Sequence, residues 1–517
     1  MPGLASGPPA GAPAGSPALT TDLPLPHEDA LRRVGAAADA LGIEVYVVGG
    51  AVRDAIMRRR TTDIDFVTLG AGTGEALAEA VAGDLDGLVA HVYTAFGTAA
   101  VRVPPDTLPG EGDELVLEFV GARRESYRAD SRKPIVEDGS LVEDLARRDF
   151  TVNALAVALN SDRFGELIDP SGGLADLSAR KLRTPLDPER TFDDDPLRMM
   201  RAARFAAQLR FTVDAPAVAA MRSMAGRIEI VSQERVTDEL QRIVASPAPA
   251  TGLALLYDTG VLHHVFPELV KLAGVEAVGG HRHKDNFHHT LEVLENLVAM
   301  QRAAGTADER AEGDALWLRW AALLHDIAKP DTKRFITGTG WTFHGHDELG
   351  ARRVSKIFRR LKLPLGDPAR YVEAIVRLHH RPTALVDDEV SDSAVRRLLF
   401  DAGDAVDDLM MMVRADVTSK NPARVRRYLA GFDHVEARMH EVEDKDHLRN
   451  FEPPVDGHEI MTSLGLEPGP AVGALKNALE QAILDGVIPN EHDAAFDYMM
   501  SIKDEVLASV GGRDRPR

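Results

Sequence analysis

The sequence predicts an α+β fold, with a small mixed α/β part near the N-terminus and an all-helical remainder. Between about residues 43 and 167, short runs rich in β-branched and aromatic residues stand between helical stretches. From about Asp195 onward the apolar residues fall at helical spacing, as in Leu291, Leu294 and Leu297. At 517 residues the chain exceeds a single core, so two to four domains are expected.

The first part contains four expected strands, at residues 44–48, 64–68, 99–103 and 115–120. A proline-rich tract, residues 103–110, separates the last two runs. Proline has no N–H group to donate to a strand ladder, so we expect this tract to form a surface loop at a hairpin. In the helical remainder, residues 279–286 and 441–454 interrupt the pattern and predict joints.

The composition excludes several classes of protein. With 60 Lys and Arg against 81 Asp and Glu, the formal net charge is −21, which argues against a non-specific nucleic-acid coat but permits a local basic face. Cysteine is absent, so any metal must be held by His and carboxylates. Residues 1–26 are expected to be a disordered leader. No apolar run reaches the roughly 18 to 20 residues that span a bilayer, so we expect a cytoplasmic protein without a membrane partner.

Two acids at alternate positions of the second strand give the strongest chemical signal. Asp63 and Asp65 face the same way, while Ile64 and Phe66 pack behind them. Glu118 interrupts the fourth apolar run and is expected to be a third carboxylate, although an ordinary charge on an edge strand also explains it. Nucleotidyl transfer requires carboxylates that hold one or two Mg²⁺ ions, so the acids predict a magnesium site.

A Gly-Gly turn precedes the acid pair. Gly49 and Gly50 permit close approach of a phosphate to the backbone, and Arg53 can reach its oxygens. Asp54 completes this motif. Taken alone, the motif fits any tight turn before a helix, but together with the acids it favours a site for a nucleoside triphosphate.

A third block surrounds one aromatic residue, Phe150, with charged and amide groups. Arg148, Asp149 and Asn153 suit the ribose and phosphates of a nucleotide. An ion-paired helix start explains Arg148 and Asp149, but not Asn153, which is expected on the same helical face four residues further on.

These motifs resemble those of the bacterial class II CCA-adding tRNA nucleotidyltransferases, in the polymerase β-like superfamily. The resemblance covers about residues 40 to 250 and rests on residues 49–54, 63–65, 147–154 and 195–205. It implies a nucleotidyltransferase head with a mainly antiparallel sheet. Its expected partners are tRNA, CTP and ATP, and the motifs predict no particular oligomeric state.

The resemblance implies that the last of these blocks, residues 195–205, selects the incoming base. In this family an Asp-x-x-Arg motif pairs with the Watson–Crick edge, which assigns that role to Asp195 and Arg198 and places Arg201 and Arg204 in the nucleotide site. An ordinary helix cap at Asp195 with an ion pair to Arg198 explains the same residues. Asp194 stands where the family usually has glutamate, which leaves its supporting role open.

A second constellation lies downstream and resembles the HD phosphohydrolase pattern. His289, the doublet His325-Asp326, and Asp416 can converge from separate helices on one divalent metal, with Asp416 expected on the apolar face of its helix. The metal could be Mn²⁺, Ni²⁺, Mg²⁺, Fe or Zn²⁺. Each histidine taken singly is explained as a core residue. Three further histidines could support these ligands or hold a second metal: His344, His346 and His379.

The sequence therefore predicts a CCA-adding tRNA nucleotidyltransferase, with possible phosphohydrolase activity of its HD domain. The expected parts are a leader (1–26), a nucleotidyltransferase head (27–178), a helical neck with the nucleotide template (179–278), an HD domain (279–430) and a helical tail (431–517). The enzymatic alternatives are a poly(A) polymerase and a CC- or A-adding enzyme. The alternative from another class is a tRNA-binding HD phosphohydrolase with an inactive head.

Overall fold

The computed structural model describes most of the chain. The described residues are 19–20, 27–85, 87–93, 97–108, 113–126, 135–278, 281–282, 285–306, 311–387, 391–419, 421–446 and 452–511. Contacts divide the chain into two compact units, residues 1–231 with 259–261 and residues 232–258 with 262–517. This division falls inside the range expected to be the neck. Within the described residues, none of the helices is long and apolar enough to cross a membrane.

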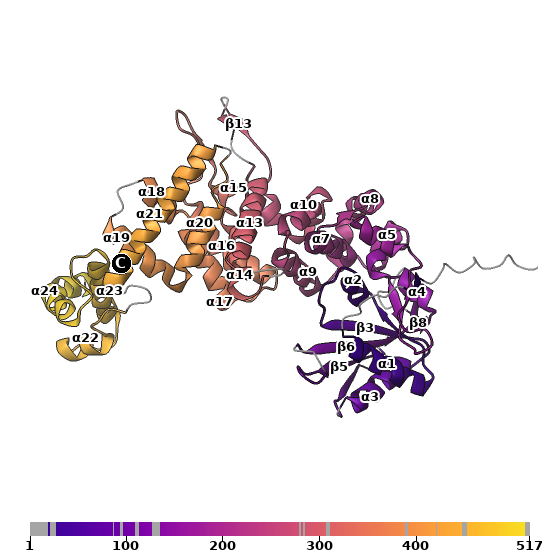
Figure 1. The fold of residues 1–517 in the computed structure, drawn as a ribbon. Helices are drawn as coiled ribbons and strands as arrows, with labels where there is room; N and C mark the ends of the chain where they lie inside the picture. The colour runs from indigo at the N-terminus through magenta and orange to yellow at the C-terminus, as the bar shows by residue number, and fades with distance from the viewer. Residues whose placement is uncertain are drawn as a thin grey trace, which may run out of the picture. The chain divides into compact units, whose positions relative to one another are not determined.

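The first unit is built on one eight-stranded sheet (Figure 1). In spatial order the strands are β1 (Leu19–Thr20), β10 (Glu166–Ile168), β9 (Ala156–Ala158), β2 (Val45–Val48), β3 (Asp63–Thr68), β6 (Leu115–Gly121), β5 (Thr98–Val103) and β4 (Ala90–Tyr93). Neighbouring strands are antiparallel except β3 and β6, which are parallel. The predicted α+β class with a mainly antiparallel sheet is confirmed. The four strands expected from the sequence form, and the proline-rich tract joins the antiparallel pair β5 and β6 as predicted.

One strand lies within the expected leader. Leu19–Thr20 pairs with Glu166 and Leu167 of β10, so the expectation of disorder is wrong for these two residues. Without β1, β10 would expose a free edge of the sheet. The N–H and C=O groups of such an edge can pair with the backbone of another strand, whatever the side chains of that strand are. The other residues of this range lie outside the described part of the chain.

Helices cover both faces of this sheet. The unit contains α1 (Glu28–Leu41), α2 (Gly50–Ile56), α3 (Thr73–Asp84), α4 (Leu141–Ala146), α5 (Gly173–Ser178), α6 (Pro188–Asp194), α7 (Leu197–Leu209), α8 (Ala215–Met224), the 3₁₀ turns η1 (Thr151–Asn153) and η2 (Ala225–Ile230), and the strand pairs β7 (Arg123–Ser126) with β8 (Ile135–Asp138) and β11 (Lys181–Leu182) with β12 (Thr212–Val213). One face packs on α1 and α3, and there the rings of Phe66 and Phe119 stack with centroids 4.8 Å apart.

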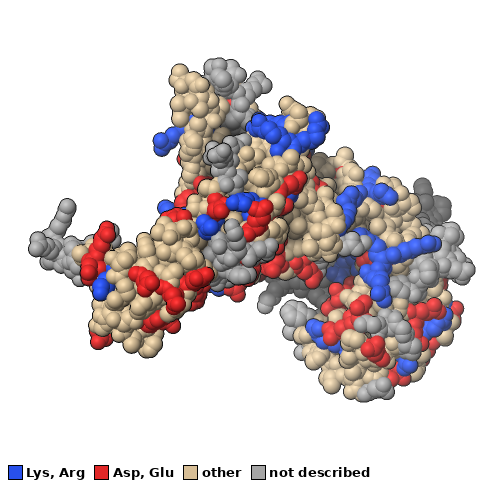
Figure 2. All heavy atoms as spheres, turned by 60° about the vertical axis from the view of Figure 1, so that its left-hand side comes forward, with Lys and Arg blue, Asp and Glu red and all other residues tan. Residues whose placement is uncertain are grey.

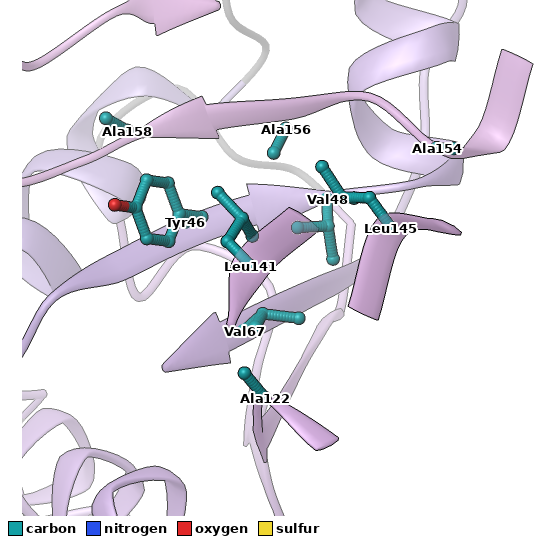
Figure 3. Packing of buried hydrophobic residues seen from close by; sticks show 9 residues of the cluster. All are labelled: Tyr46, Val48, Val67, Ala122, Leu141, Leu145, Ala154, Ala156 and Ala158. Atoms are coloured by element: carbon teal, nitrogen blue, oxygen red, sulfur yellow. The ribbon is translucent and has the colours of Figure 1, made fainter. Parts of the chain in front are cut away.

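The opposite face is partly covered by α4. Figure 3 shows Leu141 and Leu145 of this helix over a layer of mostly small side chains. The layer comprises Tyr46, Val48, Val67, Ala122, Ala154, Ala156 and Ala158. Val67 follows Asp65 by two residues, so the layer and the acids share one face of β3. Small residues let α4 approach closely, which places the residues after it beside the acids.

The second unit is almost entirely helical. Its helices are α9 (Gln233–Ala245), α10 (Pro249–Asp258), α11 (Val261–Val265), α12 (Pro267–Val270), α13 (Asn286–Ala303), α14 (Gly313–Leu324), α15 (Lys329–Thr332), α16 (His346–Arg360), α17 (Asp367–Leu378), α18 (Arg381–Asp387), α19 (Asp392–Ala402), α20 (Val406–Ala415), α21 (Pro422–Asp446), α22 (Gly457–Leu464), α23 (Pro470–Leu484) and α24 (His492–Gly511), with the 3₁₀ turn η3 (Gly403–Ala405). Two hairpins interrupt it: β13 (Ala277–Val278) with β14 (His281–Arg282), and β15 (Arg334–Ile336) with β16 (Gly340–Thr342).

A buried arginine ties three of these helices together. Arg319 of α14 donates to the carbonyl oxygens of Val244, Ala245 and Ser246 at the end of α9, at 3.1, 2.8 and 2.7 Å. Its Nε also donates to Gln301 Oε1 of α13 at 2.7 Å. The guanidinium thereby satisfies carbonyl groups that a helix end leaves without partners.

Candidate functional site

Three carboxylates meet at one end of the sheet. The register pairs Asp65 with Glu118 across the parallel strands β3 and β6, and Asp63 lies two residues before Asp65 on the same face. Asp63 and Glu118 are exposed and Asp65 is half-buried, whereas Ile64 and Phe66 are buried behind them. The expected alternation of β3 and the expected origin of Glu118 from a neighbouring strand are confirmed.

The electrostatics of these acids favour a bound cation. Burial raises the pKa of Asp65, the Arg148 charge opposes this rise, and Asp63 adds to it. Burial followed by the charges of Asp65 and Asp63 also raises the pKa of Glu118. A divalent ion relieves both the repulsion and the burial penalty, and hard oxygen ligands suit Mg²⁺. The residues present therefore fit the expected magnesium site.

The turn before α2 needs glycine at its first position. Gly49 has φ 73°, in the left-handed region, and a Cβ atom there would lie 2.7 Å from Nη1 of Arg148. Arg148 is held in turn by Asp144, whose Oδ2 lies 3.2 Å from Nη2. Gly50 begins α2. A guanidinium thus lies directly over the backbone that the sequence predicts to approach phosphate.

Arg53 lies in the interior rather than at an open surface. Its guanidinium donates to both carboxylate oxygens of Asp54, at 2.9 and 2.7 Å, and to Asn153 Oδ1 at 2.7 Å. The side chain is buried and lies 5.2 Å from the centre of the Phe205 ring. These contacts connect α2, η1 and α7. In this structure Arg53 and Asp54 therefore fix these three elements relative to one another from the interior of the unit.

Asp149 is the buried centre of the third block. Its carboxylate accepts from Nε of Arg201 at 2.7 Å, from Nδ2 of Asn153 at 3.0 Å and from the Phe150 N–H at 2.8 Å. Burial would raise the pKa of Asp149, but Arg201 and Asn153 outweigh it and lower the value to about 2. The expected α-helical face is wrong, because Asn153 lies in the 3₁₀ turn η1 and reaches Asp149 across a tight turn.

The proposed base-selecting residues lie at the corner between α6 and α7. Asp195 Oδ1 accepts from the Leu197 N–H at 3.2 Å, a capping contact at the start of α7. Arg198 donates to the carbonyl oxygens of Thr191 at 3.2 Å and Arg147 at 2.6 Å. Arg204, one turn beyond Arg201, is buried with its guanidinium 4.4 Å from the Phe205 ring centre. The corner thus fixes the arginine through backbone carbonyls.

The HD residues converge in the second unit. His289 Nε2 lies 3.0 Å from Asp416 Oδ1 and 3.6 Å from Asp326 Oδ2, and His325 Nε2 lies 3.2 Å from Asp326 Oδ2. Asp416 directly follows α20 instead of lying within it. Its N–H still donates to the Met412 carbonyl oxygen, as in a further residue of the helix, so the backbone continues the helical path to this position. Two imidazoles and two carboxylates suit a transition-metal ion.

The charges of this cluster are balanced internally. Burial raises the pKa of Asp326, but His325 and Lys329 outweigh it and hold the value well below normal. Lys329, whose Nζ lies 2.6 Å from Asp326 Oδ2, was not among the predicted residues. The sequence did contain a signal for this pair: Lys329 stands three residues after Asp326, and that spacing brings two side chains together on a helical turn.

Of the additional histidines, His346 and His379 are buried and meet, with their Nε2 atoms 3.3 Å apart. His344 is exposed and stands outside the two His/Asp groups found among the described residues. His380 joins His346 and His379 instead. The expectation for His344 is therefore not met, because it lies ahead of the Gly345 turn that starts α16.

Three family models match the chain in order. They are the poly A polymerase head domain over residues 45–183, the probable RNA- and SrmB-binding site of polymerase A over 210–272, and the HD domain over 286–402. An A-adding tRNA nucleotidyltransferase of Deinococcus radiodurans is 33% identical over 461 residues, 87% of this chain and 93% of the relative.

The chain belongs to the CCA-adding tRNA nucleotidyltransferase family. A multifunctional CCA protein of Pseudomonas paraeruginosa is 33% identical to this nucleotidyltransferase over 359 residues, 67% of this chain and 78% of the relative. The Thermotoga maritima CCA-adding enzyme complexed with tRNA shares its fold, with a TM-score of 0.57, 21% identity and coverage of 95% of this chain and 97% of that one.

Proposed function

We propose that this nucleotidyltransferase adds C, C and A to the 3′ end of tRNA, using CTP and ATP at the acidic end of its sheet. The observation that carries the proposal is the alignment of Asp63, Asp65 and Glu118 beside the Gly49 turn, in a chain of this family. In each step the tRNA 3′-hydroxyl oxygen bonds to the α-phosphorus of the nucleotide, while the bond to the departing pyrophosphate breaks.

The residues divide the work among them. Asp63, Asp65 and Glu118 would hold two Mg²⁺ ions, which when bound offset the charge of the triphosphate and of the attacking oxygen. The Gly50 amide and the Arg148 guanidinium over this turn would face the phosphates, whereas the Gly49 N–H donates to the Leu155 carbonyl oxygen at 3.0 Å and holds the turn. Asn153 and Asp149, braced by Arg53 and Arg201, would bind the ribose. Asp195 and Arg198 would pair with the incoming base.

Replacement of both central acids tests the site. Asp63→Ala with Asp65→Ala should abolish incorporation of CTP and ATP while tRNA binding stays nearly intact, because the chemistry is lost but the rest of the surface remains. Filter binding and a primer-extension gel on the same preparation measure the two properties. Incorporation that persists would contradict the assignment and would favour an inactive head.

A narrower activity, addition of A alone, is a second candidate because the Deinococcus relative bears that name. The stretch between Glu118 and Arg147, which includes β7 and β8, leaves room for the loop that the resemblance associates with switching from C to A. Transcripts ending before the first C, after C and after CC should be incubated with CTP and ATP separately. Incorporation of C into the first two transcripts together with A into the third supports full CCA addition. C without A indicates a CC-adding enzyme, and A incorporation into the third transcript alone supports the narrower activity.

We also propose that the HD site hydrolyses phosphate esters at tRNA ends. Convergence of His289, His325, Asp326 and Asp416 supports this activity. Mn²⁺-dependent release of phosphate from a 3′-phosphorylated transcript, or opening of a 2′,3′-cyclic phosphate, should disappear in His289→Ala with Asp416→Ala. The same release should persist in Asp63→Ala with Asp65→Ala. No hydrolysis by the unmodified protein under any divalent metal would contradict this second activity.

A further inference from the structure

A cleft in the second unit is lined by aromatic rings and cations together. Its volume is about 550 Å³, within the roughly 300–1,000 Å³ of pockets that bind small ligands. Most of its wall comes from the hairpin of β15 and β16, the start of α21 and the segment that follows α20. In Figure 1, α21 lies beside α18 and α20. A space of this size suits one small molecule or the end of a longer chain.

Tyr428 and Arg424 form the best-defined pair in this cleft. They stand four residues apart on α21, a spacing that brings side chains together on a helix. The Arg424 guanidinium lies 5.6 Å from the centre of the Tyr428 ring, and that of Arg427 lies 5.0 Å from it. Tyr428 is half-buried, so part of its ring is accessible. A nucleotide carries a flat base and a phosphate, and this pair offers a partner to each.

Trp341 provides a second ring, on the opposite side of the chain's cleft-lining elements in β16. Antiparallel pairing places it across from Phe335, and the two rings meet edge to face with centres 5.4 Å apart. Nζ of Lys333 lies 5.4 Å from the centre of the Trp341 ring. Trp341 is half-buried and lines the cleft. Bases of a single strand stack on such rings whatever their sequence, because every base has a π-face.

The charges of the cleft favour an anionic ligand at Arg424. Lys329 and Lys333 already contact carboxylates. Asp416, in the lining, contacts His289. The Arg424 side chain is exposed, and within the described part of the chain its guanidinium contacts no carboxylate. A phosphate would supply the charged acceptor that this guanidinium lacks.

We propose that this cleft binds the unpaired 3′ end of an RNA strand, with Arg424 on a phosphate and with Tyr428 and Trp341 stacked on bases. A duplex is excluded from such binding because its base faces are covered by its own stacking. The cleft borders His289 and Asp416, so a strand held in this way presents its terminal phosphate to the residues proposed to hydrolyse it. The choice of the 3′ end rests on that proposed hydrolase activity, whereas the binding of a single strand does not.

Tryptophan fluorescence in EDTA tests the binding without hydrolysis. The probe is a short single-stranded RNA that ends in a 3′-phosphate, which the head cannot extend because the strand has no 3′-hydroxyl. It should quench the fluorescence of the full-length chain, and the same strand in a duplex should not. In Trp341→Phe the quenching should disappear, while anisotropy of a labelled copy of the RNA shows that binding is retained, since phenylalanine keeps a ring.

Variants of α21 separate stacking from charge. Tyr428→Ala should raise the Kd obtained from quenching by about 5- to 150-fold, the loss expected for one stacked base, and Tyr428→Phe should restore it. Arg424→Ala should also raise the Kd, and it should lower the slope of log Kd against log[NaCl] by about 0.7, the value for one phosphate of a single strand. The matched control, Arg426→Ala, removes an exposed cation of the same helix that is not one of the described residues lining the cleft, and it should leave the quenching unchanged.

The outcomes separate this proposal from the hydrolase activity. Quenching that persists in Trp341→Phe, or a Kd that is unchanged in Arg424→Ala, overturns the proposal, and so does equal quenching by an acidic peptide, which would show a general anion site. RNA binding in the cleft without metal-dependent hydrolysis supports the proposal and contradicts the activity, whereas hydrolysis without quenching of Trp341 does the reverse. Circular dichroism checks that Tyr428→Ala folds, and Arg424→Ala, at an exposed position, decides between the outcomes if it does not.

Discussion

Single residues in the head experience opposing demands of catalysis and stability. Asp65 is half-buried beside Asp63, and its raised pKa shows that its charge disfavours the metal-free fold. An acid whose pKa is higher in the folded than in the unfolded state lowers stability once pH rises above the unfolded value, which is near 3.9 for Asp. The charge is retained in spite of this cost, as expected for a metal ligand.

Neutralising Asp65 should therefore separate the two properties. In EDTA at neutral pH, Asp65→Asn should unfold at a higher temperature than the unmodified protein, because the buried repulsion is gone, and it should not incorporate CTP or ATP. Calorimetry and primer extension measure these effects. Asp162→Asn, an exposed control, should change neither, and a lower unfolding temperature for Asp65→Asn would contradict the electrostatic argument.

Asp149 shows the opposite behaviour. Its pKa of about 2 means that ionisation stabilises the fold above the unfolded value near 3.9, a contribution lost as pH falls toward 2. Asp149→Asn should lower the free energy of unfolding by about 2–3 kcal/mol at pH 7, because Arg201 loses its carboxylate partner. Urea denaturation at pH 7 and at pH 3 measures the effect, and a loss that does not shrink at pH 3 would assign it to packing instead.

At the scale of elements, the α6–α7 corner places the proposed base-pairing groups before any nucleotide arrives. Arg198 donates to Thr191 on α6 and to Arg147 beyond α4, so two elements fix its guanidinium. Such preorganisation lets a side-chain pair discriminate between bases without the cost of ordering it during each step.

Asp195→Ala should reduce this discrimination. Loss of one base-edge contact costs about 1–3 kcal/mol, so the preference for CTP and ATP over UTP and GTP should fall by about 5- to 150-fold. Competition assays with all four nucleotides give the ratio of kcat/KM values. The exposed neighbour Asp193, paired with Arg227, provides the control Asp193→Ala, and an equal loss in both variants would mean that helix packing is responsible.

The comparison of elements also shows what the sequence could predict. Alternation determined the direction of Asp63 and Asp65 because a strand has only two faces. The apolar run around Glu118 predicted a neighbouring strand, but only the structure shows that this strand lies between two others. Arg53 was expected to face phosphate but binds Asp54 and Asn153, since its partner comes from a turn a hundred residues away. His380 was missed for the same reason: only the packing of α16 against α17 brings it to His346.

At the scale of the whole molecule, a chain of −21 must bind a polyanion if the proposed function holds. On the face shown in Figure 2, Lys and Arg gather in a few patches separated by acidic or neutral surface. Association with tRNA should then depend on local phosphate contacts that release counterions, in spite of long-range repulsion.

Salt dependence distinguishes these two contributions. Raising NaCl from about 50 to 200 mM should weaken tRNA binding by about tenfold or more, since even two neutralised phosphates produce a change of this size. Fluorescence anisotropy with labelled tRNA measures the Kd. Binding that strengthens with salt would show that net repulsion dominates and that the basic patches do not contact phosphate.

The contact of Arg319 with the end of α9 has a consequence for synthesis on the ribosome. The carbonyl groups of Val244, Ala245 and Ser246 have no guanidinium partner until Arg319 is synthesised, more than seventy residues later. Domains generally fold as units from the N-terminus as they emerge. We therefore expect the sheet that carries Asp63, Asp65 and Glu118 to form while the end of α9 is still frayed, so that the nascent chain has its three acids in place before its second unit has folded.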